Sequence, residues 1–210
     1  MSAFLEELAS LFIGQGQDLE WTFNLAHIPS IDEYLDMVPK KTGGFMRMIV
    51  RLCLLVGPDS VADKFRATLE GFAETLGKFF QIRDDYMNLS SGEYSNQKGF
   101  AEDLDEGKFS YPLILASNTS GNKQVRHRLM GMLRVSRGES RSVEEKKYMI
   151  GLMEKVGAIK DTRKVLIEME GEMEKMIERL EVESAIKNSL MRVKVVSLSV
   201  AGSGEGCRRG

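Results

Sequence analysis

The chain has 210 residues, 42% of them hydrophobic and 29% charged, which is the balance of a soluble globular protein with one substantial core. Its formal net charge of −2 argues against a general nucleic-acid-binding role, because proteins that bind phosphate backbones usually carry a basic surplus. Thirteen methionines and only four prolines favour packed helices over a β-sandwich.

An amphipathic helix is predicted at the N-terminus, where apolar residues recur at steps of three and four. Glu6 and Glu7, together with the lack of a basic region, distinguish this segment from a signal peptide. The sequence Gly14-Gln15-Gly16 then offers either a helix end or a close-packing position inside a longer helix.

Two further helices are predicted between residues 31 and 56. Ser30 and Glu33 form a capping box that starts a helix near residue 31, and Pro39 lies at or near its end. The nearly all-apolar segment 46–56 predicts a buried helix that is too short to span a membrane. The scarcity of cysteines favours a reduced, cytoplasmic protein with Cys53 in its core.

The second half of the chain is also helical in pattern. Residues 61–88 form one long periodic segment with several aromatic residues, typical of a helix that lines a core or a pocket. We expect a loop over 90–99, a short helix over 111–116, a capped helix from 143 to about 156 and a last long helix over 159–187. The sequence therefore predicts an all-α fold, with one domain over 1–190 and a weakly ordered Gly-, Ser- and Arg-containing tail over 191–210.

Asp84, Asp85 and Asn88 are the residues that most suggest chemistry, because they lie at the polar end of an apolar helix. On a helix, Asp84 and Asn88 lie one turn apart on the same face. Proteins typically hold Mg²⁺ with one or two carboxylates and leave the remaining positions to water and substrate phosphates. The three side chains are therefore a candidate metal site. The alternative is a solvated or helix-capping acidic pair.

Lys98 and Lys108 lie in the glycine-punctuated segment that follows. Lysine ammonium groups are effective point-charge partners for phosphate. Carboxylate-held Mg²⁺ facing two lysines is the layout expected for binding a diphosphate. Either lysine by itself would be interpreted as a surface cation.

Three collinear segments within residues 1–118 resemble the trans-isoprenyl diphosphate synthases, and most closely the fungal-type geranylgeranyl diphosphate synthases. The segment FQIRDDYMNL, followed by KGFAEDLDEGKFSYPLI, is similar to the second aspartate-rich region of that family. The segments GQGQDLEW and YLDMVPKKTGG are similar to two regions that precede it in the family.

This resemblance implies an all-α isoprenoid-synthase bundle with a central cavity for prenyl diphosphates. Family members use Mg²⁺ to remove diphosphate from an allylic substrate, the resulting cation is attacked by isopentenyl diphosphate, and a proton then leaves. Metal and lysines stabilise the leaving group, while an apolar wall shields the cation from water. The resemblance also implies a homodimer, or a heterodimer with a complete synthase, with neither nucleic acid nor a membrane span.

The roles of individual residues follow from the resemblance by position. Asp84 would ligate Mg²⁺ with Asp85 and Asn88 in the same metal cluster, and Asp84, Lys98 and Lys108 would form the catalytic set. Allylic substrate and its diphosphate would contact a larger set, with the two aromatic rings near the prenyl chain: Lys41, Thr42, Gln81, Asn88, Lys98, Lys108, Phe79 and Phe80.

The chain departs from the family in one important respect. It lacks the first aspartate-rich motif, D-D-x-x-D, which in the family precedes the GQG segment and normally holds two of three Mg²⁺ ions; its only adjacent Asp pair is Asp84-Asp85. The upstream residues that bind isopentenyl diphosphate and set product length have no counterpart either. We therefore expect the C-terminal two thirds of a synthase, with little turnover by this chain alone.

Three functions remain open at this point. They are a geranylgeranyl-type prenyltransferase, a catalytically impaired paralogue that pairs with a complete synthase, and a relative of the class I terpene cyclases. The segment KGFAEDLDEGK favours synthase over cyclase ancestry.

Overall fold

The structure, a computed structural model, describes residues 2–24, 26–56, 59–90, 99–119, 123–135 and 140–179. The fold is all-α, as predicted. In chain order the elements are α1 (Ser2–Phe23), α2 (Ile31–Val38), the π-helical turn η1 (Pro39–Gly43), α3 (Gly44–Val56), α4 (Asp59–Ser90), α6 (Glu102–Glu106), α7 (Tyr111–Asn118), α8 (Lys123–Val135), α9 (Val143–Lys155) and α10 (Ala158–Arg179). The tail predicted over 191–210 lies outside the described residues.

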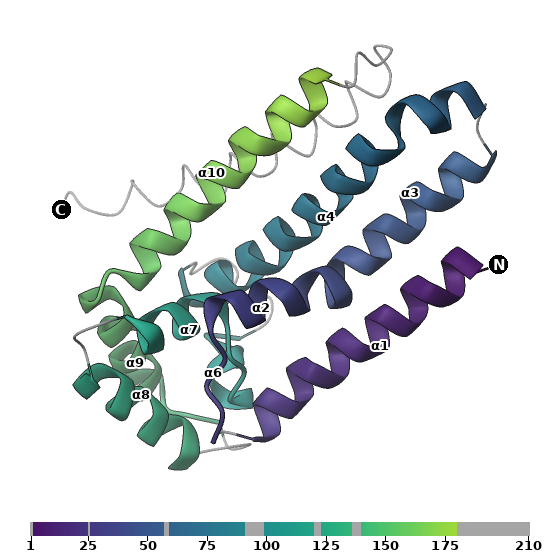
Figure 1. The fold of residues 1–210 in the computed structure, drawn as a ribbon. Helices are drawn as coiled ribbons and strands as arrows, with labels where there is room; N and C mark the ends of the chain where they lie inside the picture. Colours follow the sequence, from purple (N-terminus) through teal and green to yellow (C-terminus); the bar gives the residue numbers. More distant parts are fainter. Residues whose placement is uncertain are drawn as a thin grey trace.

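Four helices that run roughly alongside one another determine the shape of the molecule. They are α1, α3, α4 and α10, and the other helices gather near the end where α1 and α4 finish (Figure 1). Helix α4 packs against α3, η1 and α10 along its length and against α6 and α7. This arrangement brings the C-terminal part of α4, which carries the candidate metal residues, into the cluster of short helices.

Local signals explain where two of the helices begin. The Ser30 hydroxyl accepts from the Glu33 amide at 3.1 Å, and the Glu33 carboxylate accepts from the Ser30 amide at 2.7 Å. Ser142 and Glu145 form the same reciprocal pair at the start of α9, at 3.2 and 2.9 Å. Both predicted capping boxes are therefore confirmed. Of the two roles open to Gly14, the structure shows the internal position, within α1.

The core is concentrated among the short helices. The fully buried side chains include Tyr34, Met37, Ile82, Leu104, Phe109, Leu113, Ile114, Leu129, Leu133, Met149 and Met153. None of the described helices is both long enough and apolar enough to cross a membrane.

Helix α3 corrects one prediction. A helix over 46–56 is confirmed as part of α3, but its predicted burial is wrong: Leu54 is buried, whereas Leu52, Leu55 and Val56 are exposed. Cys53, expected in the core, is also exposed. The apolar side of α3 faces outward, and none of the described elements covers it, so composition alone could not fix its burial.

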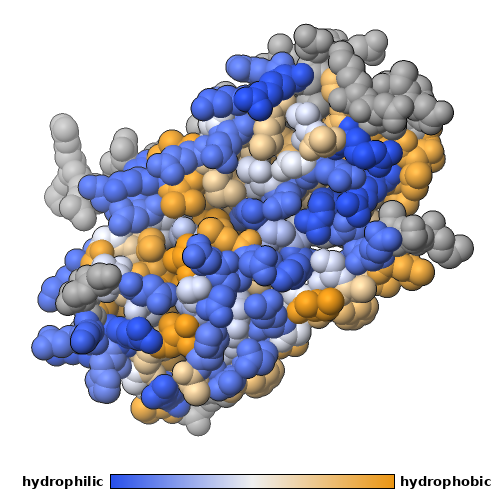
Figure 2. Space-filling view, in the orientation of Figure 1, coloured by the Kyte–Doolittle hydropathy of each residue, from blue (hydrophilic) through white to orange (hydrophobic). Residues whose placement is uncertain are grey.

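Helix α1 also exposes apolar side chains, and it buries charged ones. Its buried positions include the carboxylates Glu7 and Asp18, whereas Phe12, Ile13 and Phe23 are between 62% and 68% exposed. Apolar side chains gather along the edge of the molecule where α1 lies and at the far end of α3 (Figure 2). Contiguous exposed apolar surface of this kind marks an interaction surface or a tendency to aggregate.

We predict that replacing Phe12 and Leu52 together with glutamate will reduce self-association while leaving the folding free energy within about 1 kcal/mol, because both side chains are exposed. Light scattering coupled to gel filtration gives the mass, and urea unfolding gives the stability. Leu54→Glu is the control, since it would bury a carboxylate in α3 and should destabilise the fold severely. An unchanged mass for the double variant would contradict the prediction.

Candidate active site

The π-helical turn η1 is held between two glycines on neighbouring helices. A Cβ atom added at Gly14 of α1 would lie 2.5 Å from the Lys41 nitrogen, and one added at Gly77 of α4 would lie 2.5 Å from Gly43 Cα. Both helices therefore approach the backbone of η1 more closely than a side chain would allow. Such π-helical turns are rare and frequently occur at functional sites, and this one carries Lys41 and Thr42.

Lys41 and Thr42 contact different helices. The Lys41 ammonium donates to the buried Asp18 carboxylate of α1 at 2.5 Å, and the Thr42 hydroxyl donates to the Gln81 side-chain oxygen of α4 at 3.0 Å. The structure thus brings together two residues of the predicted substrate-binding set, Thr42 and Gln81. It also adds Asp18, which the sequence reasoning did not single out although it lies in the GQGQDLEW segment.

The carboxylate of Asp85 is the centre of a buried hydrogen-bond network. Its Oδ1 accepts from Gln81 Nε2 and from Lys108 Nζ, both at 3.0 Å. Its Oδ2 accepts from the Tyr34 hydroxyl at 2.7 Å and from the Tyr111 amide at 2.8 Å. The side chain is fully buried, so one charged group connects α2, α4 and the start of α7.

Lys108 lies between two carboxylates, since its ammonium also donates to Asp103 Oδ2 at 3.0 Å. Burial by itself would lower the pKa of Lys108, but attraction to Asp85 and Asp103 outweighs it and the pKa is raised. Burial is the main cause that raises the pKa of Asp103 to about 6, and repulsion from Asp85 adds to it. Lys108 is therefore a fixed cation at neutral pH, in a cluster with an excess of carboxylates.

The three residues predicted to form one metal cluster lie on α4 and differ in their contacts. Asp84 is half-buried, whereas both oxygens of Asp85 are engaged by four protein donors, and the Asn88 side-chain oxygen accepts from the Asp103 amide at 3.4 Å. Because successive helical residues point about 100° apart, adjacent aspartates cannot share a face. Asp84 and Asn88, one turn apart, share a face of α4, whereas the oxygens of Asp85 are engaged by protein donors. Metal binding by the three residues stays a prediction.

The donor chemistry still fits Mg²⁺ at Asp84. Within the described residues no group of three or more His, Cys, Asp or Glu side chains is arranged to hold a metal ion. Mg²⁺ needs only one or two carboxylates when substrate phosphates and water complete its shell. Asp84 lies beside the buried network, and its charge reaches Asp103. Metal ligation by Asp84 stays a prediction.

The remaining predicted residues fall in different places. Phe79 is buried in the core and Phe80 is half-buried, with the two rings edge to face at 6.2 Å. Lys98 lies outside the described residues. Tyr34 and Asp103 contribute to the network without having been assigned a role, and the signal available for both was their place in the quoted segments YLDMVPKKTGG and KGFAEDLDEGKFSYPLI.

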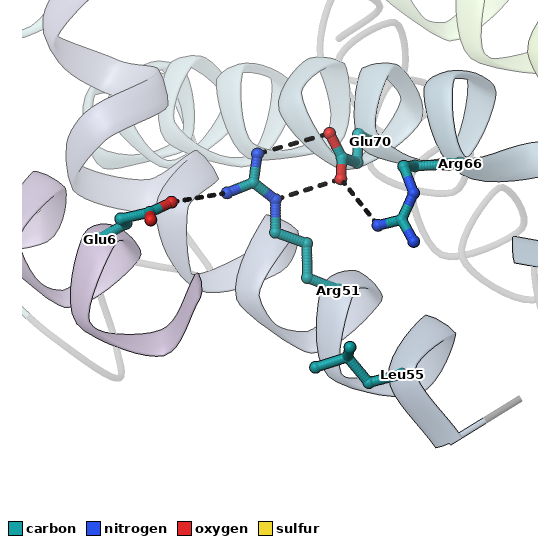
Figure 3. A pocket seen from close by; sticks show the side chains of 5 residues that line it. All are labelled: Glu6, Arg51, Leu55, Arg66 and Glu70. Carbon is teal, nitrogen blue, oxygen red and sulfur yellow. Dashed lines mark hydrogen bonds and ion pairs between the residues drawn. The ribbon is translucent and has the colours of Figure 1, made fainter. Parts of the chain in front are cut away.

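A hollow in the surface contains none of the predicted site residues. It has a volume of about 370 Å³ and is lined by Glu6, Arg51, Leu55, Arg66 and Glu70, of which Arg51 lies between Glu6 and Glu70 (Figure 3). Arg51 donates to Glu70 at 3.1 Å and also pairs with the buried Glu7 at 2.9 Å. These ion pairs connect α1, α3 and α4, so we interpret the residues around the hollow as stabilising the packing of the three helices.

We expect Asp103→Asn to stabilise the fold at pH 7.5 and to stabilise it clearly less at pH 4.5. The pKa of Asp103 is raised from 3.8 to about 6 in the folded protein, so between these values the folded state binds the proton more tightly than the unfolded chain does. Stability from this group is fully present below pH 3.8 and is lost as the pH rises through about 6, so part of it is already lost at pH 4.5. The difference is at most about 3 kcal/mol, since one pKa unit corresponds to about 1.4 kcal/mol.

Urea unfolding of both proteins at the two pH values measures this difference. Lys108 keeps its contact with Asp85 in the variant, so the cation is not left unpaired. Asp161→Asn, at an exposed position on α10, is the control for a general charge effect. Equal effects of Asp103→Asn at both pH values would contradict the assignment.

Solved structures share this fold. The crystal structure of geranylgeranyl pyrophosphate synthetase from Pyrococcus horikoshii Ot3 superposes with a TM-score of 0.76, covering 96% of this chain and 57% of that chain. The sequences are 20% identical, so this likeness shows the fold alone.

Curated relatives are more similar in sequence but much longer. Ophiobolin F synthase of Aspergillus calidoustus is 41% identical over 206 residues, and ophiobolin F synthase oblA of Emericella variicolor is 44% identical over 204 residues. In each case the match covers 94% of this chain and 28% of the relative. The chain thus spans less than a third of the length of these relatives.

The family comparison agrees with the fold and with the motifs. The model of the family described as polyprenyl synthetase matches residues 1–153, which include η1, α4 and the buried network around Asp85. Because the match covers more than half of the chain, the chain belongs to the polyprenyl synthetase family.

Proposed function

We propose that this chain forms the diphosphate-binding part of a prenyl diphosphate synthase, in which an allylic diphosphate condenses with isopentenyl diphosphate in a Mg²⁺-dependent reaction. The observation that carries the proposal is the buried network in which the carboxylates of Asp85, the residue next to Asp84 on α4, and of Asp103 hold the Lys108 ammonium. Family membership and the fold support it.

Three described side chains would contact the diphosphate: Lys41, Thr42 and Lys108. Each is held by a hydrogen bond or ion pair of 3.0 Å or shorter within the protein. Preorganised cations and donors need no reorganisation when negative charge develops on the leaving group, which is why they lower the barrier to its departure. Lys98 is proposed as a fourth contact from the resemblance alone.

Asp84 is the proposed Mg²⁺ ligand. The metal, when bound, would neutralise charge on the departing diphosphate. We assign Asp85 a positioning role instead, because its oxygens orient Gln81 and Lys108. Phe79 and Phe80 are proposed to lie near the prenyl chain, where apolar side chains would shield a developing allylic cation from water.

Calorimetric titration of the 210-residue chain with inorganic pyrophosphate, with and without MgCl₂, tests this proposal. We expect Asp84→Asn to remove the Mg²⁺-dependent part of the affinity while the fold, checked by circular dichroism, is kept. Asp161→Asn on α10 is the matched control and should bind like the unmodified chain. Unchanged Mg²⁺-dependent binding by Asp84→Asn would refute the assignment.

A second candidate function follows from the names of the relatives. The ophiobolin F synthases are 41% and 44% identical to this chain, whereas the geranylgeranyl pyrophosphate synthetase is 20% identical. The same diphosphate site would then serve a terpene synthase. Gas chromatography of the products from allylic and isopentenyl diphosphates separates the two, since linear prenyl alcohols after phosphatase treatment indicate the first function and cyclic terpenes the second.

The proposed partner is a second copy of this chain or a complete synthase. The exposed apolar faces of α1 and α3 support this proposal. Mixing the chain with a complete family member and measuring the mass of the complex distinguishes a heterodimer from a homodimer. The domain limit at residue 190, the cytoplasmic location and a geranylgeranyl product also stay predictions.

A further inference from the structure

The segment that carries Asp103 and Lys108 has one residue, Ala101, in a backbone conformation that its type does not favour, whereas Gly99 and Gly107 adopt positive φ angles readily. Gly99, Ala101 and Gly107 have positive φ angles of 83°, 51° and 73°, and Ala101 is fully buried. A residue with a Cβ atom rarely adopts the left-handed conformation. The helix between them, α6, has only five residues. Contacts with other elements must therefore hold segment 99–108 in place.

Two carboxylates of α6 reach opposite sides. Asp103 contacts Lys108, at the network around Asp85. Asp105 instead accepts from the Arg141 amide at 2.8 Å and from the Lys146 ammonium at 2.5 Å. Helix α6 is thus held by the candidate active site on one side and by two residues from the start of α9 and the segment before it on the other.

Lys146 and Arg141 also bind the backbone of this segment. The Lys146 ammonium donates to the Phe100 carbonyl at 2.7 Å, and the Arg141 guanidinium donates to the Leu104 carbonyl. The guanidinium further donates to the Met132 and Leu133 carbonyls at 3.3 and 3.2 Å, which ties the segment to the end of α8. We call Asp105, Arg141 and Lys146 the Asp105 cluster.

Burial of these cations points to a role in geometry. Lys146 is 6% exposed and Arg141 is 4% exposed, whereas the neighbouring Lys147 is exposed. A buried ion pair adds little net stability compared with apolar side chains of similar volume, because both charges lose their hydration. The Lys146 ammonium, however, makes directional hydrogen bonds to two points of segment 99–108, the Phe100 carbonyl and Asp105. These bonds fix the position of the segment in a way that an apolar side chain would not.

We propose that Arg141 and Lys146 are positioning residues, which act through segment 99–108 to place Lys108 for diphosphate binding. The proposal rests on the function proposed above for Lys108. Neither side chain contacts the network around Asp85 directly, so their effect passes through Asp105 and the loop backbone.

The first test measures the loop itself. Lys146→Met removes the ammonium and keeps the length of the side chain, and Lys147→Met is the matched control on the same helix. Hydrogen–deuterium exchange followed by mass spectrometry is expected to show faster exchange over residues 99–110 in Lys146→Met alone. Unchanged exchange in that segment would overturn the proposal. Asp105→Ala removes the acceptor of Lys146 and of the Arg141 amide from the loop side, and it decides the question if Lys146→Met does not fold.

The second test measures the consequence for the ligand. Residues that orient the groups in direct contact with a ligand typically change its affinity by about 10-fold or more when they are replaced. Lys146→Met should therefore weaken Mg²⁺-dependent pyrophosphate binding about 10-fold. If Lys146 acts through Lys108, the same change made in a Lys108→Met background should cause no further loss. A further loss of the same size would assign Lys146 a general structural role and overturn the proposal.

The two tests separate the two proposals. If the unmodified chain binds no pyrophosphate, the proposed function fails, and the exchange measurement alone decides whether the Asp105 cluster holds the loop. If the chain binds pyrophosphate and Lys108→Met weakens this binding to a lower but measurable affinity, the proposed function stands, and an unaltered affinity in Lys146→Met rejects only the positioning role.

Discussion

Asp85→Ala is expected to destabilise the protein by about 3–5 kcal/mol, the usual cost of removing one partner of a buried charge pair. The loss would leave the Lys108 ammonium with Asp103 as its remaining carboxylate. It would also remove the acceptor of the Tyr34 hydroxyl and of the Tyr111 amide, both in the core. Since single domains are stable by only about 5–15 kcal/mol, this change should be visible in urea unfolding.

Asp84→Ala is the matched control for this prediction. Asp84 precedes Asp85 on the same helix but is half-buried, so its loss should cost clearly less than the loss of the fully buried Asp85. The two adjacent aspartates would then have different roles: Asp85 stabilises the fold, and Asp84 binds the metal. Equal destabilisation by the two substitutions would contradict this division.

Features that depend on residues close together in the sequence could be predicted, whereas features that depend on distant residues could not. The starts of α2 and α9 could be predicted because a capping box involves residues three positions apart. The length of α4 could be predicted because its apolar periodicity is continuous. By contrast, the pairing of Tyr34 with Asp85 spans 51 positions and depends on how α2 meets α4, which no local pattern encodes.

Two features escaped prediction for physical reasons that can be named. The apolar composition of α3 indicates that one of its faces packs against another segment, but it does not identify that segment. Among the described elements, none covers Leu52 or Val56. The π-helical turn at 39–43 was not predicted, because proline usually ends a helix and Pro39 was interpreted in that way. Helix geometry itself could have separated Asp84 from Asp85, since neighbouring residues point in different directions.

Gly77→Ala is expected to destabilise the fold by about 2–3 kcal/mol, the upper part of the range for overpacking. Its Cβ would lie 2.5 Å from Gly43 Cα and 2.8 Å from Gly43 N, which are backbone atoms that cannot rotate away. Helix α4 and η1 must therefore separate, and the hydrogen bond from Thr42 to Gln81, 3.0 Å in this structure, would lengthen. Pyrophosphate affinity should fall with it if Thr42 contacts the diphosphate.

Gly71→Ala provides the control, because it lies on the same helix and a Cβ there would meet no atom within 4 Å. That substitution should stabilise the protein by about 0.5–1 kcal/mol, since alanine loses less conformational freedom than glycine in a helix. The two changes are chemically identical and are expected to have opposite signs, which removes helix propensity as an explanation. Stabilisation by both would mean that α4 can move away from η1 at little cost, and that the close approach does not fix the position of Lys41 and Thr42.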